Sequence, residues 1–295
     1  MENYILSCCS TADLTRAHFL ARDIRYICFH YELDGKQHTD DLGETMPFSE
    51  FYQALRDGAE AKTSQVNVDE FERYFEPFLL AGQDIVHVCL SSGISGVLNS
   101  AMSAKADLEA KYPGRKIYVV DSLGASSGYG LLMDHLADLR DGGMGAAELA
   151  AWAEANRLRL HHWFFSTDLK FYVRGGRISK AAGMVGSILG ICPLLNMDDQ
   201  GRLIPRKKIR TKRKVIEAIV ERMEENAEGG LGYAGKCYIS QSDCMEDARE
   251  VARLVEERFP RLSGRVEIYS VGTTIGSHTG PGTVALFFWG APRTE

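Results

Sequence analysis

Small hydroxyl-bearing side chains recur where apolar runs end in the first half of the chain. Ser10-Thr11 follows one such run, Ser91-Ser92-Gly93-Ile94-Ser95-Gly96 follows a second, and Asp121-Ser122 follows a third. A further cluster, Thr63-Ser64-Gln65, precedes a predicted helix. Because ligands bind outside the carboxyl ends of the strands in an open parallel sheet, these loops form a candidate site.

The loop from Ser91 to Gly96 has the features of an anion site. Gly93 and Gly96 allow close approach of the backbone, and N–H groups at the start of the following helix favour an anion. Hydroxyl groups donate hydrogen bonds without adding charge, so this donor set fits a singly charged carboxylate better than a polyphosphate. Helix capping by serine is the alternative interpretation of any one of these loops.

A histidine lies in a glycine-rich segment just before the last predicted strand. The segment reads Ser277-His278-Thr279-Gly280-Pro281-Gly282 and is predicted to be a turn. A histidine in such a turn can donate to an anion or exchange protons near neutral pH, or it can simply be solvated. Ser92, Asp121 and His278 have the side chains of a hydrolase triad, but their spacing alone does not support one.

Two short motifs match known signatures in the wrong structural context. Gly124-Ala125-Ser126-Ser127-Gly128 matches the nucleophile elbow, but the preceding strand ends several residues earlier, which favours a helix start. Gly230-Leu231-Gly232-Tyr233-Ala234-Gly235 matches a dinucleotide fingerprint, but it follows a predicted helix and precedes a strand, which favours a connector.

A serine-dependent acyl hydrolase using Ser92 or Ser126 with His278 is the alternative to a protein that only binds its ligand.

Two different patterns of elements position these loops. Apolar strands alternating with amphipathic helices in the first half predict a doubly wound, mostly parallel α/β sheet covered on both faces. Hairpins mixed with helices in the second half predict an α+β domain. We expect an N-terminal domain over residues 1–160, with a small hairpin insertion near 31–45, and a C-terminal domain over 161–295. The ligand would lie between them.

Local signals predict several finer features. Asp34-Gly35 indicates a hairpin turn. Ser10 to Asp13 is expected to cap a helix over 14–21, and Asp243 with Glu246 is expected to form a capping box. Residues 181–191 are apolar but punctuated by glycine, which is expected either for the wall of an apolar tunnel or for close packing of a helix on a sheet.

Composition excludes several classes of protein. The chain of 295 residues is 45% hydrophobic and carries a net charge of −6, which argues against disorder and against a dedicated nucleic-acid binder. We expect no transmembrane helix, no stable membrane insertion and no signal peptide. The seven cysteines show no metal-binding spacing, so we expect no metal or cofactor, and a reducing, cytoplasmic location.

Basic residues cluster between positions 202 and 214. They are Arg202, Arg206, Lys207, Lys208, Arg210, Lys212, Arg213 and Lys214. Alternation along a strand predicts that Arg206, Lys208 and Arg210 share one face. The cluster is a solvated surface, a docking face for an acidic partner, a surface that attracts anionic lipid headgroups, or a nucleic-acid-binding patch. The acidic net charge of the chain disfavours nucleic-acid binding.

Taken in order, these motifs resemble the DegV family of bacterial fatty-acid-binding proteins. The matching segments span nearly the whole chain and are Ser10-Thr11-Ala12-Asp13-Leu14, Thr63-Ser64-Gln65, Ser91 to Gly96, Asp121-Ser122, Arg174-Gly175-Gly176-Arg177-Ile178 and His278-Thr279-Gly280-Pro281-Gly282. One departure is Cys9, which stands where the family often has an aspartate and so removes a carboxylate from the first loop.

The resemblance implies a two-domain protein that holds one long-chain fatty acid between its domains and presents it to a separate fatty-acid kinase for phospholipid synthesis. It implies that Thr63 and Ser92 hold the carboxylate and that His278 lies nearby. The full lipid-binding set that it implies is Thr63, Ser64, Ser92, Gly93, Ser95, Arg177, Ile178, His278, Thr279 and Gly280. The family members bind lipid rather than catalyse, so the resemblance implies no catalytic residue and no cofactor.

Overall fold

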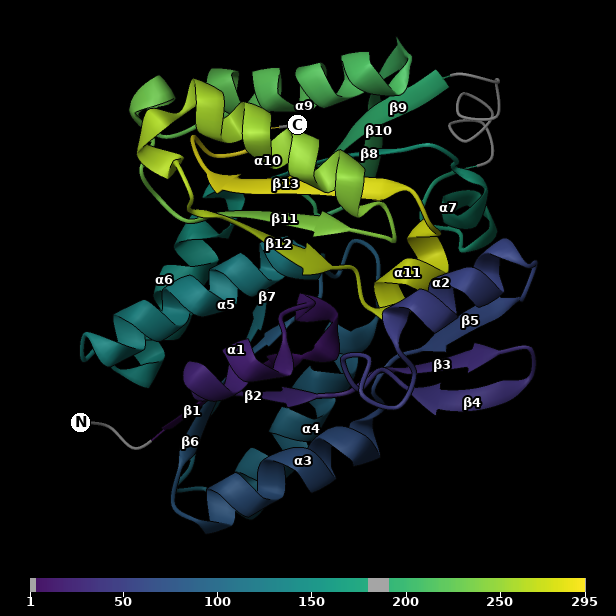
Figure 1. Ribbon diagram of the computed structural model, residues 1–295. Helices are drawn as coiled ribbons and strands as arrows, with labels where there is room; N and C mark the ends of the chain where they lie inside the picture. Colours follow the sequence, from purple (N-terminus) through teal and green to yellow (C-terminus); the bar gives the residue numbers. More distant parts are fainter. Residues whose placement is uncertain (1–3, 180–190, 295) are drawn as a thin grey trace.

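Two large sheets dominate the computed structural model, which describes residues 4–179 and 191–294. The first half of the chain builds a parallel sheet and the second half a mixed one, stacked one above the other in Figure 1. The chain therefore has the two-domain α/β architecture that its sequence predicts. The predicted boundary near residue 160 falls where the first strand of the mixed sheet begins, and it stays a prediction.

The first sheet is parallel throughout, with strand order β2-β1-β6-β7. Its strands are β1 (Tyr4–Cys9), β2 (Ile24–Ile27), β6 (Asp84–Cys89) and β7 (Ile117–Asp121). All four therefore end at the same edge, and the hydroxyl-bearing loops after β1, β6 and β7 lie at that edge, as predicted.

Helices cover both faces of this sheet. They are α1 (Arg16–Ala21), α3 (Val68–Leu80), α4 (Val97–Lys111), α5 (Ser126–Asp141) and α6 (Ala146–Asn156). Ile5, Ile85 and Ile117 join an apolar cluster with α3 and α4, whereas Leu6 and Val86 join the cluster that contains α5 and α6. Neighbouring strand residues point to opposite faces, so continuous apolar strands require this double cover.

A small antiparallel sheet, with strand order β4-β3-β5, projects from the first domain (Figure 1). It comprises β3 (His30–Leu33), β4 (Lys36–Thr39) and β5 (Ala61–Ser64), and α2 (Phe48–Arg56) precedes β5. The predicted hairpin forms, with Asp34 and Gly35 at φ of 47° and 79°, as a tight hairpin turn requires. Strand β5 was not predicted, because its four residues alternate polar and small side chains without an apolar pattern.

The second large sheet has strand order β10-β9-β8-β13-β11-β12, in which only β11 and β12 pair in parallel. Its strands are β8 (Leu160–Ser166), β9 (Ile191–Met197), β10 (Leu203–Arg210), β11 (Cys237–Gln241), β12 (Val266–Ser270) and β13 (Thr283–Trp289). The mixed α+β character of this half was predicted from its hairpins.

Helices also cover both faces of the second sheet. Its own helices are α7 (Lys170–Arg174), α9 (Lys212–Asn226), α10 (Met245–Arg258) and α11 (Thr273–Thr279). Helices α9 and α10 pack on the outer face, and α5 of the first domain packs on the inner face against β8, β11 and β13 (Figure 1). Helix α5 thus lies between the two sheets. Short 3-10 helices occur at Ser10–Ala12, Arg157–Arg159, Gly230–Gly232 and Pro260–Leu262.

Two predicted helix caps are wrong. Thr15 caps α1, and the Ser10–Asp13 segment before it forms a separate 3-10 turn. Asp243 and Glu246 do not form a capping box, because the Asp243 carboxylate pairs instead with Arg56 of α2. Short-range sequence signals cannot reveal such a long-range partner.

Other predictions concern the surface and the connectors. The Gly230–Gly235 segment connects α9 to β11, as predicted. Residues 181–190 of the expected tunnel wall lie outside the described residues.

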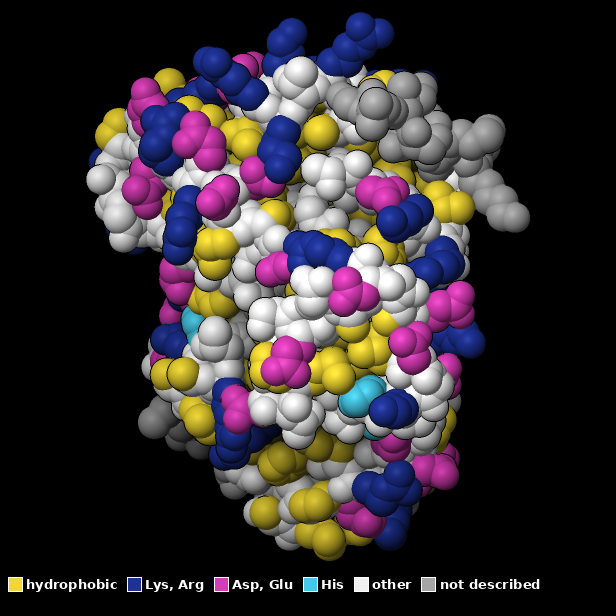
Figure 2. All heavy atoms as spheres, turned by 45° about the vertical axis from the view of Figure 1, so that its right-hand side comes forward, with side chains coloured by type: hydrophobic (Ala, Val, Ile, Leu, Met, Phe, Trp, Pro, Cys, Tyr) yellow, Lys and Arg dark blue, Asp and Glu magenta, His cyan; other side chains and the backbone are white. Residues whose placement is uncertain are grey.

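Within the described part, no helix is long and apolar enough to cross a membrane. Figure 2 shows Lys and Arg side chains interspersed with Asp and Glu over most of one face.

Candidate functional site

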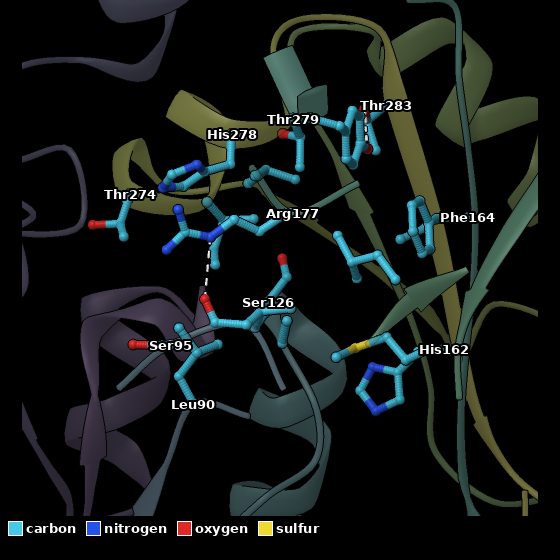
Figure 3. A pocket seen from close by; sticks show the side chains of 18 of the residues that line it. Leu90, Ser95, Ser126, His162, Phe164, Arg177, Thr274, His278, Thr279 and Thr283 are labelled. Atoms are coloured by element: carbon cyan, nitrogen blue, oxygen red, sulfur yellow. Dashed lines mark hydrogen bonds between the residues drawn. The ribbon is translucent and has the colours of Figure 1, made fainter. Parts of the chain in front are cut away.

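A cavity lies between the carboxyl edge of the parallel sheet and the inner face of the mixed sheet (Figure 3). The cavity encloses about 80 Å³, less than the roughly 300–1,000 Å³ of a preformed small-molecule site. Phe29, Leu90 and Ile94 line it from the first domain, and Phe164 and Phe287 line it from the second. None of the described lining residues is Asp or Glu.

The polar side chains at one end of the cavity are Thr63, Arg177 and His278. Thr63 Oγ1 lies 2.7 Å from His278 Nε2. The Arg177 guanidinium lies near His278 in Figure 3 and donates to the carbonyl oxygens of Ile94 and Gly175, at 3.1 and 2.6 Å. No carboxylate in the described ranges forms an ion pair with Arg177. This end therefore presents positive charge that lacks a protein counter-ion.

Three elements from distant parts of the sequence build this polar end. Thr63 lies on β5 opposite Tyr31 of β3. His278 lies in the last turn of α11, not in the turn that the sequence predicted. A Cβ atom on Gly175 would lie 2.2 Å from His278 Nδ1, so only glycine leaves room for the imidazole ring. This contact explains why position 175 of the Arg174-Gly175-Gly176-Arg177 motif is a glycine.

His278 is neutral at physiological pH. Burial, aided by the nearby positive charge of Arg177, lowers its pKa to about 4. Its Nδ1 is buried and has no hydrogen-bond partner among the described residues. Because an unpaired lone pair is tolerated better than an unpaired N–H, we assign the proton to Nε2, which donates to Thr63 Oγ1. The Thr63 hydroxyl proton is then directed toward another acceptor.

The serine-rich loop after β6 offers fewer anion-binding groups than its sequence predicted. Ser92 N–H donates to Asp121 Oδ1 and Gly93 N–H to Ser91 Oγ, both at 3.1 Å. The remaining amides of residues 91–95 also have partners within the protein. The amides of residues 91–95 are therefore not free to bind an anion.

The structure brings only part of the predicted lipid-binding set together. The members that line the cavity are Thr63, Ser95, Arg177, His278 and Thr279. Ser64 and Ser92 are exposed and lie outside the lining. Gly93 and Ile178 border a neighbouring surface groove, and Gly280 ends α11 at a φ of 66°.

The hydrolase alternative lacks the pairing that it needs. Ser126, at the start of α5, donates to Asp13 Oδ2 at 2.5 Å and lies 3.0 Å from Ser240 Oγ. His278 bonds Thr63 instead of a serine. A nucleophilic serine needs a base within hydrogen-bond reach, and among the described residues neither Ser92 nor Ser126 bonds a histidine.

A buried polar cluster joins the two domains beside the cavity. Asp13 accepts from Ser126, and Asp40 accepts from Thr273 Oγ1 at 2.9 Å. Burial, together with the negative charge of Asp40, raises the pKa of Asp13 well above its usual range. Neither carboxylate lines the cavity. The cluster was missed in the sequence because Asp40 follows a hairpin strand that carries no motif.

Cys9 lies at the end of β1, fully buried, where the family resemblance pointed to an aspartate. Its N–H donates to the Tyr129 hydroxyl at 3.0 Å. Burial raises the pKa of the thiol to about 12, so it is uncharged at neutral pH. Cys9 does not line the cavity. Any effect of Cys9 on the polar end around Thr63 and His278 is therefore indirect.

A family model described as uncharacterised protein, DegV family, matches residues 9–290. The chain belongs to the DegV family. A DegV domain-containing protein of Clostridium perfringens is 33% identical over 290 residues, which cover 98% of each chain. This relative matches the DegV chain from end to end, so the likeness includes both domains.

Solved structures share the fold of this DegV chain. A DegV family protein of Thermus thermophilus, described as binding fatty acid, has a TM-score of 0.83 at 25% identity and covers 98% of this chain and 99% of its own. The fatty acid kinase B3 protein of Streptococcus pneumoniae, loaded with linoleic acid, has a TM-score of 0.83 at 21% identity and covers 97% and 99%. The second likeness establishes the fold alone.

Proposed function

We propose that this DegV family member binds one long-chain fatty acid in the cavity between its domains. The observation that carries the proposal is a cavity with apolar walls from both domains, whose positive end has no counter-ion among residues 4–179 and 191–294. An ionised carboxylate is costly to bury without donors, and Arg177 with the Thr63 hydroxyl would supply them. The fatty-acid-binding relative from Thermus thermophilus supports the same ligand class.

The carboxylate and the hydrocarbon tail of the ligand would contribute differently to binding. The carboxylate would accept from Thr63, whose hydroxyl His278 Nε2–H orients. We place Ser95, which lines the cavity, at this end in preference to the exposed Ser92. The tail would pass between Phe164 and Phe287 and gain about 0.8 kcal/mol for each buried CH₂ group. A long chain would gain on the order of 10 kcal/mol before ordering costs.

We also propose that the protein presents the carboxyl end to a fatty-acid kinase in the cytoplasm. Arg177 lines both the cavity and a neighbouring surface groove, which Arg202, Lys207 and Lys208 also border. The head group would therefore lie beside a basic surface suited to an acidic partner. A β-bulge between Pro205 and Lys207 breaks the alternation on which the predicted common face of Arg206, Lys208 and Arg210 depended.

Binding of a fluorescent fatty acid to the delipidated chain tests the site. Ser95→Ala is expected to weaken binding several-fold, and Ser92→Ala is expected to leave it unchanged. Thr63→Val is expected to weaken it more, because it also removes the partner of His278. If Ser92→Ala weakens binding and Ser95→Ala does not, the carboxylate is held by the loop in the way the sequence predicted.

Phosphoryl transfer by a purified fatty-acid kinase tests the docking surface. Lys207→Glu with Lys208→Glu reverses two exposed charges that border the groove and is expected to slow transfer while leaving fatty-acid binding intact. The matched control is Arg253→Glu, an exposed charge reversal on α10. Unchanged transfer in the double variant at physiological salt would remove the basic groove from the proposal.

A further inference from the structure

A second pocket, the outer pocket, lies on the opposite side of the mixed sheet from the cavity between the domains. Side chains of β8 alternate between the two: His162 and Phe164 line the inter-domain cavity, whereas His161 and Trp163 line the outer pocket. The end of α9 and residues 292–294 complete its walls. The outer pocket encloses about 320 Å³, which is within the roughly 300–1,000 Å³ of small-molecule sites.

Positive charge gathers in the outer pocket. Its polar lining includes His161, Asn196, Arg206, Lys207, Arg222 and Arg293. None of the described lining residues is Asp or Glu. The Arg222 side chain is 17% exposed and also pairs with Glu225, which lies outside the lining. Four cationic side chains around one pocket favour an anionic ligand.

Arg293 contributes charge to the outer pocket more than it contributes hydrogen bonds. It is 6% exposed, and it donates to the carbonyl oxygens of Met197 and Asp198 at 3.0 and 2.9 Å. Burial lowers the pKa of its guanidinium to about 10, so the group stays charged at neutral pH. The donors that could reach a ligand therefore belong to Lys207 and Arg222, with Arg293 adding a fixed positive charge behind them.

His161 adds a group of the opposite kind, a hydrogen-bond acceptor. Its Nε2 lies 2.7 Å from the Ala291 carbonyl oxygen, which can only accept, so Nε2 carries a proton. Burial lowers the pKa of the ring to about 4, so the ring is neutral and Nδ1 has a lone pair. The ring is also held by stacking on Phe288, at 5.1 Å between centroids. Nδ1 bonds no described residue and stays accessible from the pocket.

We propose that the outer pocket binds hydrogenphosphate, an anion that carries its own hydroxyl group. Arg222 and Lys207 would donate to its ionised oxygens, and its hydroxyl would donate to His161 Nδ1. Sulfate has the same shape and charge but no proton at neutral pH, so one of its oxygens would face the His161 lone pair unpaired. The inference is independent of the proposed fatty-acid function.

Titration calorimetry of the purified full chain with inorganic phosphate, sulfate and methyl phosphate at about pH 8 tests this selectivity. A phosphate monoester loses its last proton with a pKa of about 6, so only inorganic phosphate keeps a hydroxyl under these conditions. We expect inorganic phosphate to bind roughly tenfold more tightly than the other two anions. Equal affinities, or no binding of phosphate, would overturn the inference and leave the fatty-acid proposal intact.

Two substitutions locate the bound anion. His161→Phe keeps a ring against Phe288 but removes the acceptor, so it is expected to lower the affinity for phosphate to that for sulfate. Arg222→Gln is expected to weaken binding of both anions roughly tenfold. The matched control is Arg213→Gln on the same helix, because Arg213 pairs with Glu217 and does not line the pocket. Phosphate binding that responds equally to both arginine substitutions places the anion elsewhere and overturns the inference.

A measurement on the unaltered chain covers the case in which His161→Phe does not fold. The ¹⁵N resonances of the histidine rings report which nitrogens accept a hydrogen bond. Phosphate is expected to shift the resonance of one unprotonated ring nitrogen, and sulfate is expected to shift none. A spectrum that phosphate leaves unchanged would contradict the assigned role of His161.

Discussion

At the scale of single residues, the site depends on the direction of one hydrogen bond. In the tautomer assigned above, His278 Nε2 donates to Thr63 Oγ1, which directs the hydroxyl proton toward the place where a carboxylate would lie. The low pKa of about 4 keeps His278 neutral across the physiological pH range. Arg177 supplies the charge, and the Thr63–His278 pair supplies an oriented donor.

Substitution of His278 tests that direction. Glutamine can place an N–H near the position of Nε2, so His278→Gln is expected to keep most of the affinity for a fatty acid. His278→Leu removes the donor and is expected to weaken binding by roughly tenfold, because the Thr63 hydroxyl loses its orientation. Equal affinities of the two variants, measured by titration calorimetry, would show that the ring acts only by filling space.

The burial of His278 also makes a prediction about stability and pH. The unfolded pKa of His278 is near 6.5 and the folded pKa is about 4, so its contribution is fully present above pH 6.5 and is lost as pH falls toward 4. His278→Gln does not titrate. The unfolding free energy of the variant relative to the unaltered chain is therefore expected to rise by up to about 3 kcal/mol between pH 6.5 and 4, as measured by urea denaturation. A constant difference would contradict the assigned burial.

At the scale of elements, a loop of the first domain packs against a turn of the second. The Ser91 hydroxyl donates to the Gly201 carbonyl oxygen at 2.8 Å. A Cβ atom on Gly93 would lie 2.5 Å from the carbonyl oxygens of Gln200 and Gly201. The turn between β9 and β10 thus rests directly on the loop after β6, which fixes one side of the cavity.

Gly93→Ala tests this contact. The added methyl group meets backbone atoms on the facing turn and forces the two elements apart, so we expect a loss of about 1–3 kcal/mol in unfolding free energy. Gly114→Ala is the control, because a Cβ atom there would meet no atom within 4 Å. Equal stability of the two variants in urea denaturation would show that the turn does not rest on the loop.

A second inter-domain contact carries a pH dependence of opposite sign. The pKa of Asp13 is raised in the folded state, so its contribution is present below the unfolded pKa near 4 and is lost as pH rises through the folded pKa. Asp13→Asn does not titrate at this position. Between the unfolded and the folded pKa of Asp13, the unfolding free energy of the variant minus that of the unaltered chain is therefore expected to rise by about 1.4 kcal/mol per pH unit. A difference that stays flat from pH 4 upward would show that Asp13 is ionised throughout.

The sequence predicted elements better than it predicted contacts. Long periodic segments such as α4 and the apolar strand β6 were placed within one or two residues. Strand β5 and helix α11, which hold Thr63 and His278, were taken for loops because short polar segments acquire their structure from tertiary pairing. Thr63 and His278, which the family resemblance implied as lipid-binding residues, both line the cavity, and their role in binding stays a prediction.

Residues without a motif could not be chosen in this way. His162 lies in an apolar strand, where nothing distinguishes a histidine that lines a cavity from its neighbour His161 on the other face. Only the register of β8 against β13 shows which of them faces the cavity.

At the scale of the whole molecule, the cavity lies between domains, so a ligand would contact both of them. Such a ligand binds the folded chain and not the unfolded one. At a free concentration one hundred times its dissociation constant it adds about 2.7 kcal/mol to the unfolding free energy. For a chain of this size that corresponds to a rise of roughly 4 °C in Tm.

Thermal unfolding of the delipidated chain with and without a long-chain acid measures this effect. The matched control is an alcohol of the same chain length, which lacks the carboxylate that Arg177 and Thr63 would bind. The alcohol is expected to raise Tm much less than the acid. An equal rise with both ligands would indicate that the tail binds without recognition of the head group.

The central claim is that this chain holds a fatty acid between its domains. Native mass spectrometry of the purified full chain, followed by mass analysis of its organic extract, tests it most directly. We expect a complex with a single long-chain acid per chain, and we expect Thr63→Val to carry less of it. If the chain shows only its own mass, both as purified and after incubation with stearic acid, the account is contradicted.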